Sequence, residues 1–281
     1  MSYSRDMTKP SKTKTPPILK AFENLDFLAS TEARPLRILS EYLYPKLQLE
    51  EQNIKDTIVI FGSARAPSPE DLSGDARLSK NIKLAEYYDA TRELSKRLTE
   101  WSMNLDGEGQ KYVVCSGGGP GIMIAANRGA SDVGGKSMAL RISLPFENVP
   151  NPYVTPELDF EFHYFFTRKF WFTYPAKALV IMPGGFGTLD EFFEILTLIQ
   201  TKIITKHLPI VLFGKEYWSN LINFETLIEF GTIDRDDLDL FLLPAVWTMH
   251  SSILLRASTS ATQNNSPKKT AANKIFCGRM A

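Results

Sequence analysis

The sequence feature that most restricts the fold is a short apolar run followed by a glycine-rich turn. Ala178-Leu-Val-Ile181 has the composition of a buried strand, and Met182-Pro-Gly-Gly-Phe-Gly-Thr-Leu-Asp-Glu191 follows it directly. Residues 192–200 then place apolar side chains at helical spacing. A strand, a glycine turn and a helix start, in this order, direct free backbone N–H groups and the positive end of a helix dipole at an anion. The stretch therefore predicts an anion site at a strand-to-helix turn.

The glycines of this turn and the residues after it allow two interpretations. Glycine lacks a Cβ, so the backbone at Gly184, Gly185 and Gly187 can approach a phosphate closely. Thr188 has the position of an N-cap, and Glu191 stands three residues later, which is the spacing of a capping box. From spacing alone, a structural role for Glu191 is at least as well supported as a catalytic one.

A second glycine loop has the same setting. Tyr112-Val-Val-Cys115 is a predicted strand, Ser116-Gly-Gly-Gly-Pro-Gly121 follows it, and residues 122–131 form a predicted helix. Pro120 interrupts any GxGxxG pattern, and no GxxxxGK[ST] sequence is present, so neither a dinucleotide site nor a P-loop is indicated. Two glycine loops meeting at one sheet edge would suit a single phosphate and its sugar.

The remaining elements complete an α/β pattern. Thr57–Phe61 is the first predicted strand, and its exit turn, residues 62–65, contains Ser63. Further strands are predicted at 137–143, 159–166 and 209–213, with a short apolar segment at 241–243, and helices at 81–101, 168–174 and 217–230. Strands that alternate with helices indicate a doubly wound parallel sheet covered on both faces.

The ends of the chain differ in composition from this core. Residues 1–20 are polar and predict a disordered arm, and residues 257–281 predict a flexible tail. Between the arm and the first strand, residues 21–56 predict a helical extension, because Leu36, Leu39, Leu43 and Leu47 recur at roughly helical spacing. We expect this extension to pack on the main domain, residues 57–256, or on a second subunit.

Composition excludes several classes of function. Lys and Arg balance Asp and Glu at 32 each, which argues against a nucleic-acid partner held by bulk charge. Two distant cysteines and three histidines suggest neither a disulfide framework nor a metal site. With no apolar run long enough for a bilayer and no secretory h-region, we expect a cytoplasmic protein without a membrane partner.

Arg168 and Lys169 are two adjacent cations at the start of a predicted helix. Cations are unfavourable there by about 0.3–1 kcal/mol, so their placement favours an anionic ligand, and Arg can grip a phosphate with two parallel hydrogen bonds. Asp190 and Glu194 are expected to be solvated or to act as helix-dipole partners, and His163 is expected to be structural.

Taken together, these motifs resemble the LOG ("Lonely Guy") family, also described as lysine-decarboxylase-like. The resemblance rests on Pro183-Gly-Gly-Phe-Gly-Thr-Leu-Asp-Glu191, on the pair Arg168-Lys169 and on Ser116–Met123, and it covers about residues 57–230. Residues 151–153 and 162–169 look like the longer bacterial branch of the family. The resemblance implies a Rossmann-like fold, a homodimer or higher homo-oligomer, no cofactor, and hydrolysis of nucleoside 5′-monophosphates, notably cytokinin riboside 5′-monophosphates, to free base and ribose 5-phosphate.

The resemblance also assigns roles to residues. It makes Arg168 and Glu191 the catalytic pair. It places the phosphate and substrate contacts at Ser63, Gly117, Gly118, Gly119, Gly121, Met123, Lys169, Gly184, Gly185, Gly187 and Thr188. The longer relatives usually carry Glu where this chain has Ile124, which leaves the substrate preference open. No lysine is placed for a Schiff base with a pyridoxal cofactor, so decarboxylase chemistry has no support.

Two functions from different classes are compatible with the pattern. One is the N-glycosidase. The other is a binding protein that carries or senses a nucleotide or phosphorylated cofactor with the same loops and without hydrolysis. The base-contacting residues are expected in the insert after Arg65, in 145–156 or in a partner subunit.

Overall fold

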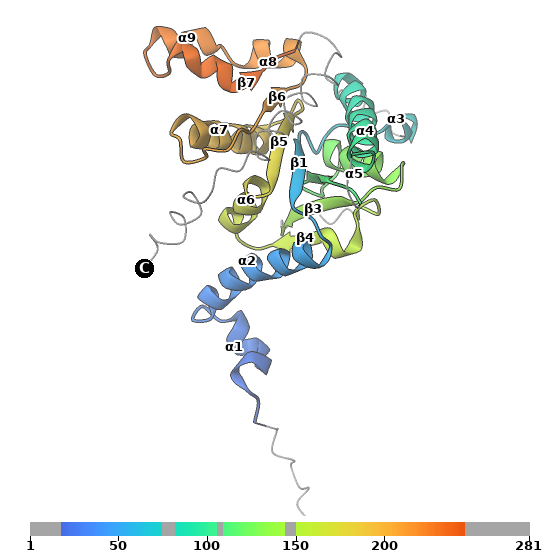
Figure 1. Ribbon diagram of the computed structural model, residues 1–281, viewed down its shortest axis with the longest axis vertical. Coiled ribbons are helices and arrows are strands. Elements are labelled where there is room, and N and C mark those ends of the chain that lie inside the picture. Colours follow the sequence, from blue (N-terminus) through green and yellow to red (C-terminus); the bar gives the residue numbers. More distant parts are fainter. Residues whose placement is uncertain (1–17, 75–81, 106–108, 144–149, 245–281) are drawn as a thin grey trace, which may run out of the picture.

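The computed structural model describes residues 18–74, 82–105, 109–143 and 150–244 (Figure 1). Residues 1–17 of the expected arm and the whole expected tail, 257–281, lie outside the described residues. Within the described ranges, no helix combines the length and the apolar character that crossing a membrane requires.

One parallel sheet organises the described chain. Its strand order is β4-β3-β2-β1-β5-β6-β7, and every neighbouring pair is parallel. The strands are β1 (Asp56–Phe61), β2 (Tyr112–Ser116), β3 (Ser137–Ile142), β4 (Asp159–Phe162), β5 (Ala176–Ile181), β6 (Ile210–Leu212) and β7 (Phe241–Leu242). The chain builds outward from β1 to β4 and then returns to place β5 beside β1. The predicted doubly wound, Rossmann-like α/β fold is confirmed, and its winding reverses between β1 and β5.

Helices cover both faces of this sheet (Figure 1). They are α3 (Pro69–Gly74), α4 (Ile82–Met103), α5 (Ile122–Ser131), α6 (Phe165–Thr173), α7 (Phe186–Gln200), α8 (Lys215–Leu221) and α9 (Phe224–Glu229). Short 3-10 segments lie at Ala21–Glu23, Pro156–Leu158 and Arg235–Leu240. In the figure α4 and α5 lie on one side of β1, and α6 and α7 on the other.

Side chains of the central strand alternate between two hydrophobic cores. Ile58 and Ile60 join the core under α4 and α5, whereas Val59 and Phe61 join the core under α6, α7 and α8. Because successive residues of a strand point to opposite faces, a strand buried on both faces reads as a continuous apolar run. This is why Thr57-Ile-Val-Ile-Phe61 was recognisable from the sequence.

The N-terminal extension forms α1 (Leu25–Ala29) and α2 (Arg34–Glu51). Arg37 holds these two helices together, because its Nη1 donates to the carbonyl oxygens of Leu28 and Ser30, both at 2.6 Å. The α2 helix packs on the main domain: the ring of Tyr44 meets Phe160 of β4 edge to face at 5.9 Å between centroids. Figure 1 shows α2 beside β4, with α1 farther from the sheet.

Two predicted boundaries were wrong. The strand expected at 159–166 ends at Phe162, and α6 begins at Phe165, before Arg168. Aromatic residues fit either a strand or a buried helix, so the run 164–166 gave no periodic signal at the junction. The helix expected at 217–230 is divided into α8 and α9, because α8 ends at Leu221, Ile222 is extended, and Asn223 caps α9 by accepting the N–H of Thr226.

Candidate active site

A cavity of about 1160 Å³ opens at the carboxyl edge of the sheet, beside the point where the winding reverses. It is lined by the exit turns of β1, β2 and β5, by Arg168 of α6 and by Glu191 of α7. Because the strands are parallel, the two glycine loops lie at the same edge, as predicted. Ligands of open α/β sheets bind at this kind of position.

Ser63, at the exit of β1, joins the two glycine loops through its backbone. Its N–H donates to the carbonyl of Pro183 at 3.0 Å, and its own carbonyl accepts the N–H of Ile122 at 3.0 Å. Its hydroxyl accepts the N–H of Arg65 at 3.1 Å. The loop after β5 and the loop after β2 are therefore both hydrogen-bonded to one residue.

Glycine is required in the loop after β2 for two separate reasons. Gly121 has φ +67°, and a Cβ there would lie 2.4 Å from the carbonyl oxygen of Ser63. Gly117 is different, because a Cβ there would lie 2.7 Å from Sδ of Met123 and 2.8 Å from Nη2 of Arg168. The guanidinium of Arg168 thus lies directly against the glycine loop.

A buried polar network supports this loop from below. Asn127 of α5 is fully buried, and its Oδ1 accepts from the Ser116 hydroxyl at 2.7 Å and from Nδ2 of Asn151 at 3.0 Å. Its Nδ2 donates to the carbonyl of Met138 at 3.2 Å. The Ser116 hydroxyl in turn accepts the N–H of Gly118 at 3.1 Å. The network joins the loop to α5, to β3 and to the segment after β3.

The loop after β5 leads directly into α7, but not through the predicted capping box. The helix begins at Phe186 with Gly185 as its N-cap, and glycine has no side chain that could cap the helix. Thr188 lies within the first turn, with its side chain against Gly184, and Glu191 is five residues into the helix. The capping-box interpretation is therefore wrong. Tyr217 fixes the loop from α8, because its hydroxyl donates to the carbonyl of Gly184 at 2.7 Å.

Arg168 is half-buried and held on three sides. Its Nε donates to the carbonyl of Leu140 on β3 at 2.8 Å. Its guanidinium carbon lies 5.0 Å from the ring centroid of Phe172, within cation–π distance. With Gly117 on the third side, the guanidinium is placed at the wall of the cavity before any ligand binds.

Glu191 is 6% exposed and lines the same cavity. Burial raises the pKa of its carboxyl from 4.5 to about 7, an effect that Arg168 and Lys169 partly oppose. Glu194 and Asp190, as neighbouring acids, add to the rise. A carboxyl that titrates near neutral pH can either accept or donate a proton under ordinary conditions, which suits acid–base chemistry.

Lys169 points to acidic partners on α7. Its Nζ lies 2.8 Å from Asp190 Oδ2 and 2.5 Å from Glu194 Oε2. Asp190 and Glu194, expected to be solvated or dipole partners, are thus ion-pair partners that tie α6 to α7. These pairs bring together the two helices that carry Arg168 and Glu191.

The structure brings most of the predicted site residues to this cavity. Its lining includes Ser63, Gly117, Gly119, Met123, Arg168, Gly184, Gly185, Gly187, Thr188 and Glu191. Gly118, Gly121 and Lys169, which were also predicted to contact phosphate or substrate, are not in that lining. Gly118 lies against Ala139 and Arg141, and Gly121 against Ser63. Ile124 packs, half-buried, against the core under α4 and α5.

Several lining residues were missed from the sequence. Arg141 of β3 makes a two-pronged pair with Asp159 of β4, Nε to Oδ1 at 2.6 Å and Nη2 to Oδ2 at 3.0 Å. Both residues line the cavity, with Glu161 and Phe165 beside them. The alternation of polar and apolar residues along 159–162 already showed that 159 and 161 share one face, and this signal could have placed them.

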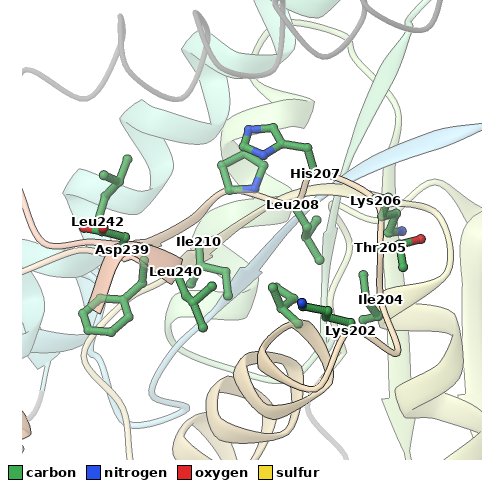
Figure 2. A pocket seen from close by; sticks show the side chains of 13 residues that line it. Lys202, Ile204, Thr205, Lys206, His207, Leu208, Ile210, Asp239, Leu240 and Leu242 are labelled. Carbon is green, nitrogen blue, oxygen red and sulfur yellow. The ribbon is translucent and has the colours of Figure 1, made fainter. Parts of the chain in front are cut away.

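A second cavity, of about 360 Å³, lies at the amino ends of β6 and β7 (Figure 2). Its wall is mostly apolar, with Leu208, Ile210 and Leu240 among its residues. Lys206 also borders it, but its Nζ donates to the carbonyls of Thr173 and Tyr174, at 2.7 and 2.8 Å, at the C-terminus of α6. Burial lowers the pKa of Lys206 to about 8. Neither glycine loop reaches this cavity, so the larger one is the candidate active site.

Part of this sequence is similar to known proteins. A family model described as "Possible lysine decarboxylase" matches residues 123–247. A relative from Oryza sativa subsp. japonica, the probable cytokinin riboside 5′-monophosphate phosphoribohydrolase LOG4, is 28% identical over 158 residues. That match spans 55% of this chain and 63% of the relative, which is less than two thirds of the relative's length.

Two solved structures show a weaker likeness to this chain. A structural-genomics target, TM1055, gives a TM-score of 0.44 at 20% identity, over 74% of this chain and 99% of that one. The Moco carrier protein from Chlamydomonas reinhardtii gives 0.42 at 17% identity, over 75% of this chain and 96% of that one.

The sheet order and the two glycine loops define a Rossmann-like α/β protein with a site at its switch point. Within that class, the family model and the rice relative confirm the resemblance to the LOG, or lysine-decarboxylase-like, family.

Proposed function

We propose that this protein hydrolyses the N-glycosidic bond of nucleoside 5′-monophosphates, giving free base and ribose 5-phosphate. The observation that carries the proposal is that both glycine loops, Arg168 and Glu191 line one cavity. The match to a probable phosphoribohydrolase supports it.

The 5′-phosphate is assigned to the start of α7. Gly185, Gly187 and Thr188 line the cavity at the N-terminus of this 15-residue helix, where backbone N–H groups and the helix dipole favour an anion. Gly117 and Gly119 supply the opposite wall. Gly118 and Gly121 contribute by shaping the loop, and Lys169 by joining α6 to α7 through its pairs with Asp190 and Glu194.

In the proposed reaction the bond between C1′ and the base nitrogen breaks, and its electron pair leaves with the base. The ribose ring gains oxocarbenium-like positive charge, which the ionised Glu191 carboxylate stabilises. Water adds at C1′ and gives up one proton to Glu191, while the departing base takes up one proton from solvent. Glu191 then releases its proton to solvent, so one water is consumed and the enzyme returns to its starting state. The Arg168 guanidinium holds the phosphate or hydrogen-bonds the leaving base.

Phosphate binding is remote from the bond that breaks, so its binding energy can orient the sugar. We therefore expect AMP to be hydrolysed much faster than adenosine by the purified full-length protein, with adenine and ribose 5-phosphate measured by chromatography. We expect Glu191→Gln to retain AMP binding and lose most hydrolysis. Equal turnover of AMP and adenosine would contradict the phosphate assignment, and unchanged turnover by Glu191→Gln would remove Glu191 from the reaction.

A second candidate is a carrier or sensor that binds a phosphorylated cofactor without hydrolysis. The observation in its favour is the size of the cavity, about 1160 Å³, which exceeds the range of about 300–1,000 Å³ usual for small-molecule sites. A panel of nucleoside monophosphates separates the two functions. Release of base supports the enzyme, whereas tight binding without release supports the carrier.

A further inference from the structure

The N-terminal extension makes a specific polar contact with the turn that precedes α6. Glu41 of α2 accepts the N–H of His163 on Oε1 at 2.8 Å, and the N–H of Tyr164 on Oε2 at 3.3 Å. The same Oε2 accepts the Thr167 hydroxyl at 2.5 Å. One carboxylate from outside the main domain thus binds three donors between β4 and the first turn of α6.

The charge of Glu41 suits this position. The first turn of α6 contains no acidic residue, and two cations, Arg168 and Lys169, follow within its first five residues. Negative charge at a helix N-terminus is stabilising, and cations there are not. Lys169 is paired with Asp190 and Glu194 of α7, whereas Glu41 supplies the acid at the start of the helix.

Further contacts fix the position of Glu41 relative to α6. The indole Nε1 of Trp171 donates to the backbone carbonyl of Glu41 at 3.1 Å. The ring of Tyr42 lies 5.5 Å from that of Phe170 and 5.7 Å from that of Trp171, between centroids. The α2 helix therefore contacts α6 both at its first turn and farther along.

The turn that Glu41 binds is adjacent to Arg168. The backbone N–H of Arg168 donates to the carbonyl of Tyr164 at 3.3 Å, and the N–H of Tyr164 donates to Glu41. Glu41 therefore binds the residue that accepts the backbone hydrogen bond of Arg168. The side chain of Arg168 then reaches β3, where its Nε donates to Leu140. A shift of the 163–167 turn would displace the guanidinium at the cavity wall.

We propose that Glu41 is a positioning residue of the active site, through which the N-terminal extension sets the place of Arg168. This inference rests on the proposed function. It assigns the extension a role in turnover, although Glu41 does not line the cavity.

The test compares Glu41→Ala, Glu41→Gln and a matched control, Glu50→Gln. Glu50 lies on the same helix, where it is exposed and pairs with Lys46 at 3.9 Å.

A misplacement of about 1 Å can reduce a rate about 100-fold, so we expect Glu41→Ala to lower kcat for AMP by about 10- to 100-fold. KM should change less than kcat, because the main phosphate contacts are assigned to the start of α7 and to the glycine loops. Glu41→Gln keeps one acceptor oxygen and the side-chain shape, so it should recover part of kcat, and the control should match wild type.

The pH dependence of kcat gives a readout that a loss of stability would not move. Glu191 faces Arg168 and Lys169 from α6 and Asp190 and Glu194 from its own helix. Arg168 lowers the pKa of Glu191, so its displacement should raise that pKa further. The acid limb of the kcat profile should therefore move to higher pH in Glu41→Ala and stay in place in Glu50→Gln.

Wild-type kcat and an unshifted acid limb in folded Glu41→Ala would overturn the inference while the proposed function stands. If Glu41→Ala does not fold, Glu41→Gln decides by the same two readouts. If wild type itself releases no base, the proposed function fails. The inference then depends on hydrogen exchange of the amides of residues 163–169. Faster exchange in Glu41→Ala than in Glu50→Gln supports the positioning role, and equal exchange overturns it.

Discussion

Replacing Glu191 by Gln should stabilise the unliganded protein at alkaline pH. The carboxyl of Glu191 is buried, and its pKa rises from 4.5 to about 7 on folding. The folded protein thus holds this proton more tightly than the unfolded chain does. The free energy of unfolding must therefore fall as the pH rises from about 4.5 to about 7. Above pH 7 this contribution stays constant, because Glu191 is then ionised in both states.

The size of the effect follows from the pKa difference. Each pKa unit corresponds to about 1.4 kcal/mol, so the ionised carboxylate should reduce the free energy of unfolding by about 3 kcal/mol at pH 8. At pH 5 the reduction should be below about 1 kcal/mol, because Glu191 is then protonated in the folded protein. Gln has a similar shape and does not ionise. The advantage of Glu191→Gln over wild type should therefore grow by about 2–3 kcal/mol between pH 5 and pH 8.

Urea unfolding followed by tryptophan fluorescence, at pH 5, 6, 7 and 8, measures this difference. Glu229→Gln is a suitable control, because Glu229 is exposed at the end of α9. The free energy of unfolding of Glu229→Gln should change with pH by the same amount as that of wild type at all four pH values. A difference between wild type and Glu191→Gln that is the same at pH 5 and pH 8 would refute the reasoning, since it would mean that burial does not perturb this carboxyl.

Two further substitutions test how the loop after β2 is built. Gly117→Ala puts a Cβ 2.7 Å from Met123 Sδ and 2.8 Å from Arg168 Nη2, so kcat/KM for AMP should fall about 10- to 100-fold while the fold survives. Unchanged kinetics would show that Arg168 is not needed at that place. Asn127→Leu removes the amide that bonds the Ser116 hydroxyl, the Asn151 amide and the Met138 carbonyl, and leaves Ser116 and Asn151 only their longer bonds to the carbonyls of Met123 and Gly118. Unfolding in urea should therefore show a loss of about 2–4 kcal/mol. A loss below about 1 kcal/mol would mean that water replaces the amide.

Local patterns were sufficient for most of the fold. Strands such as Thr57–Phe61 and Tyr112–Cys115 are mostly apolar because both of their faces are buried. The turns after them could be recognised in the sequence, because only glycine tolerates the close approaches of Gly62, Gly117 and Gly121 to their neighbours. Parallel strands then place all the exit turns at one edge, so topology alone brought the two loops together.

The errors and omissions arise where a residue's surroundings come from elsewhere in the chain. The spacing of Thr188 and Glu191 matched a capping box, but the N-cap is Gly185, three residues before Thr188, and Glu191 faces the cavity. Glu41 meets His163 across 122 residues of sequence, and Arg141 meets Asp159 between neighbouring strands. Alternation along 159–162 puts Asp159 and Glu161 on one face of the sheet, but local spacing does not identify the partners of Asp159 or Glu41.

The double backbone attachment of Ser63 has a consequence for how such a site can diversify. Because the turns after β2 and β5 are both hydrogen-bonded to the backbone of one residue, Ser63, remodelling either turn would disturb the other. New ligand preferences would then arise at exposed lining residues such as Arg65, Pro152 and Phe165, while the glycine loops of the cavity stay constant. Proteins with these two loops and different ligands should accordingly differ most at those exposed positions.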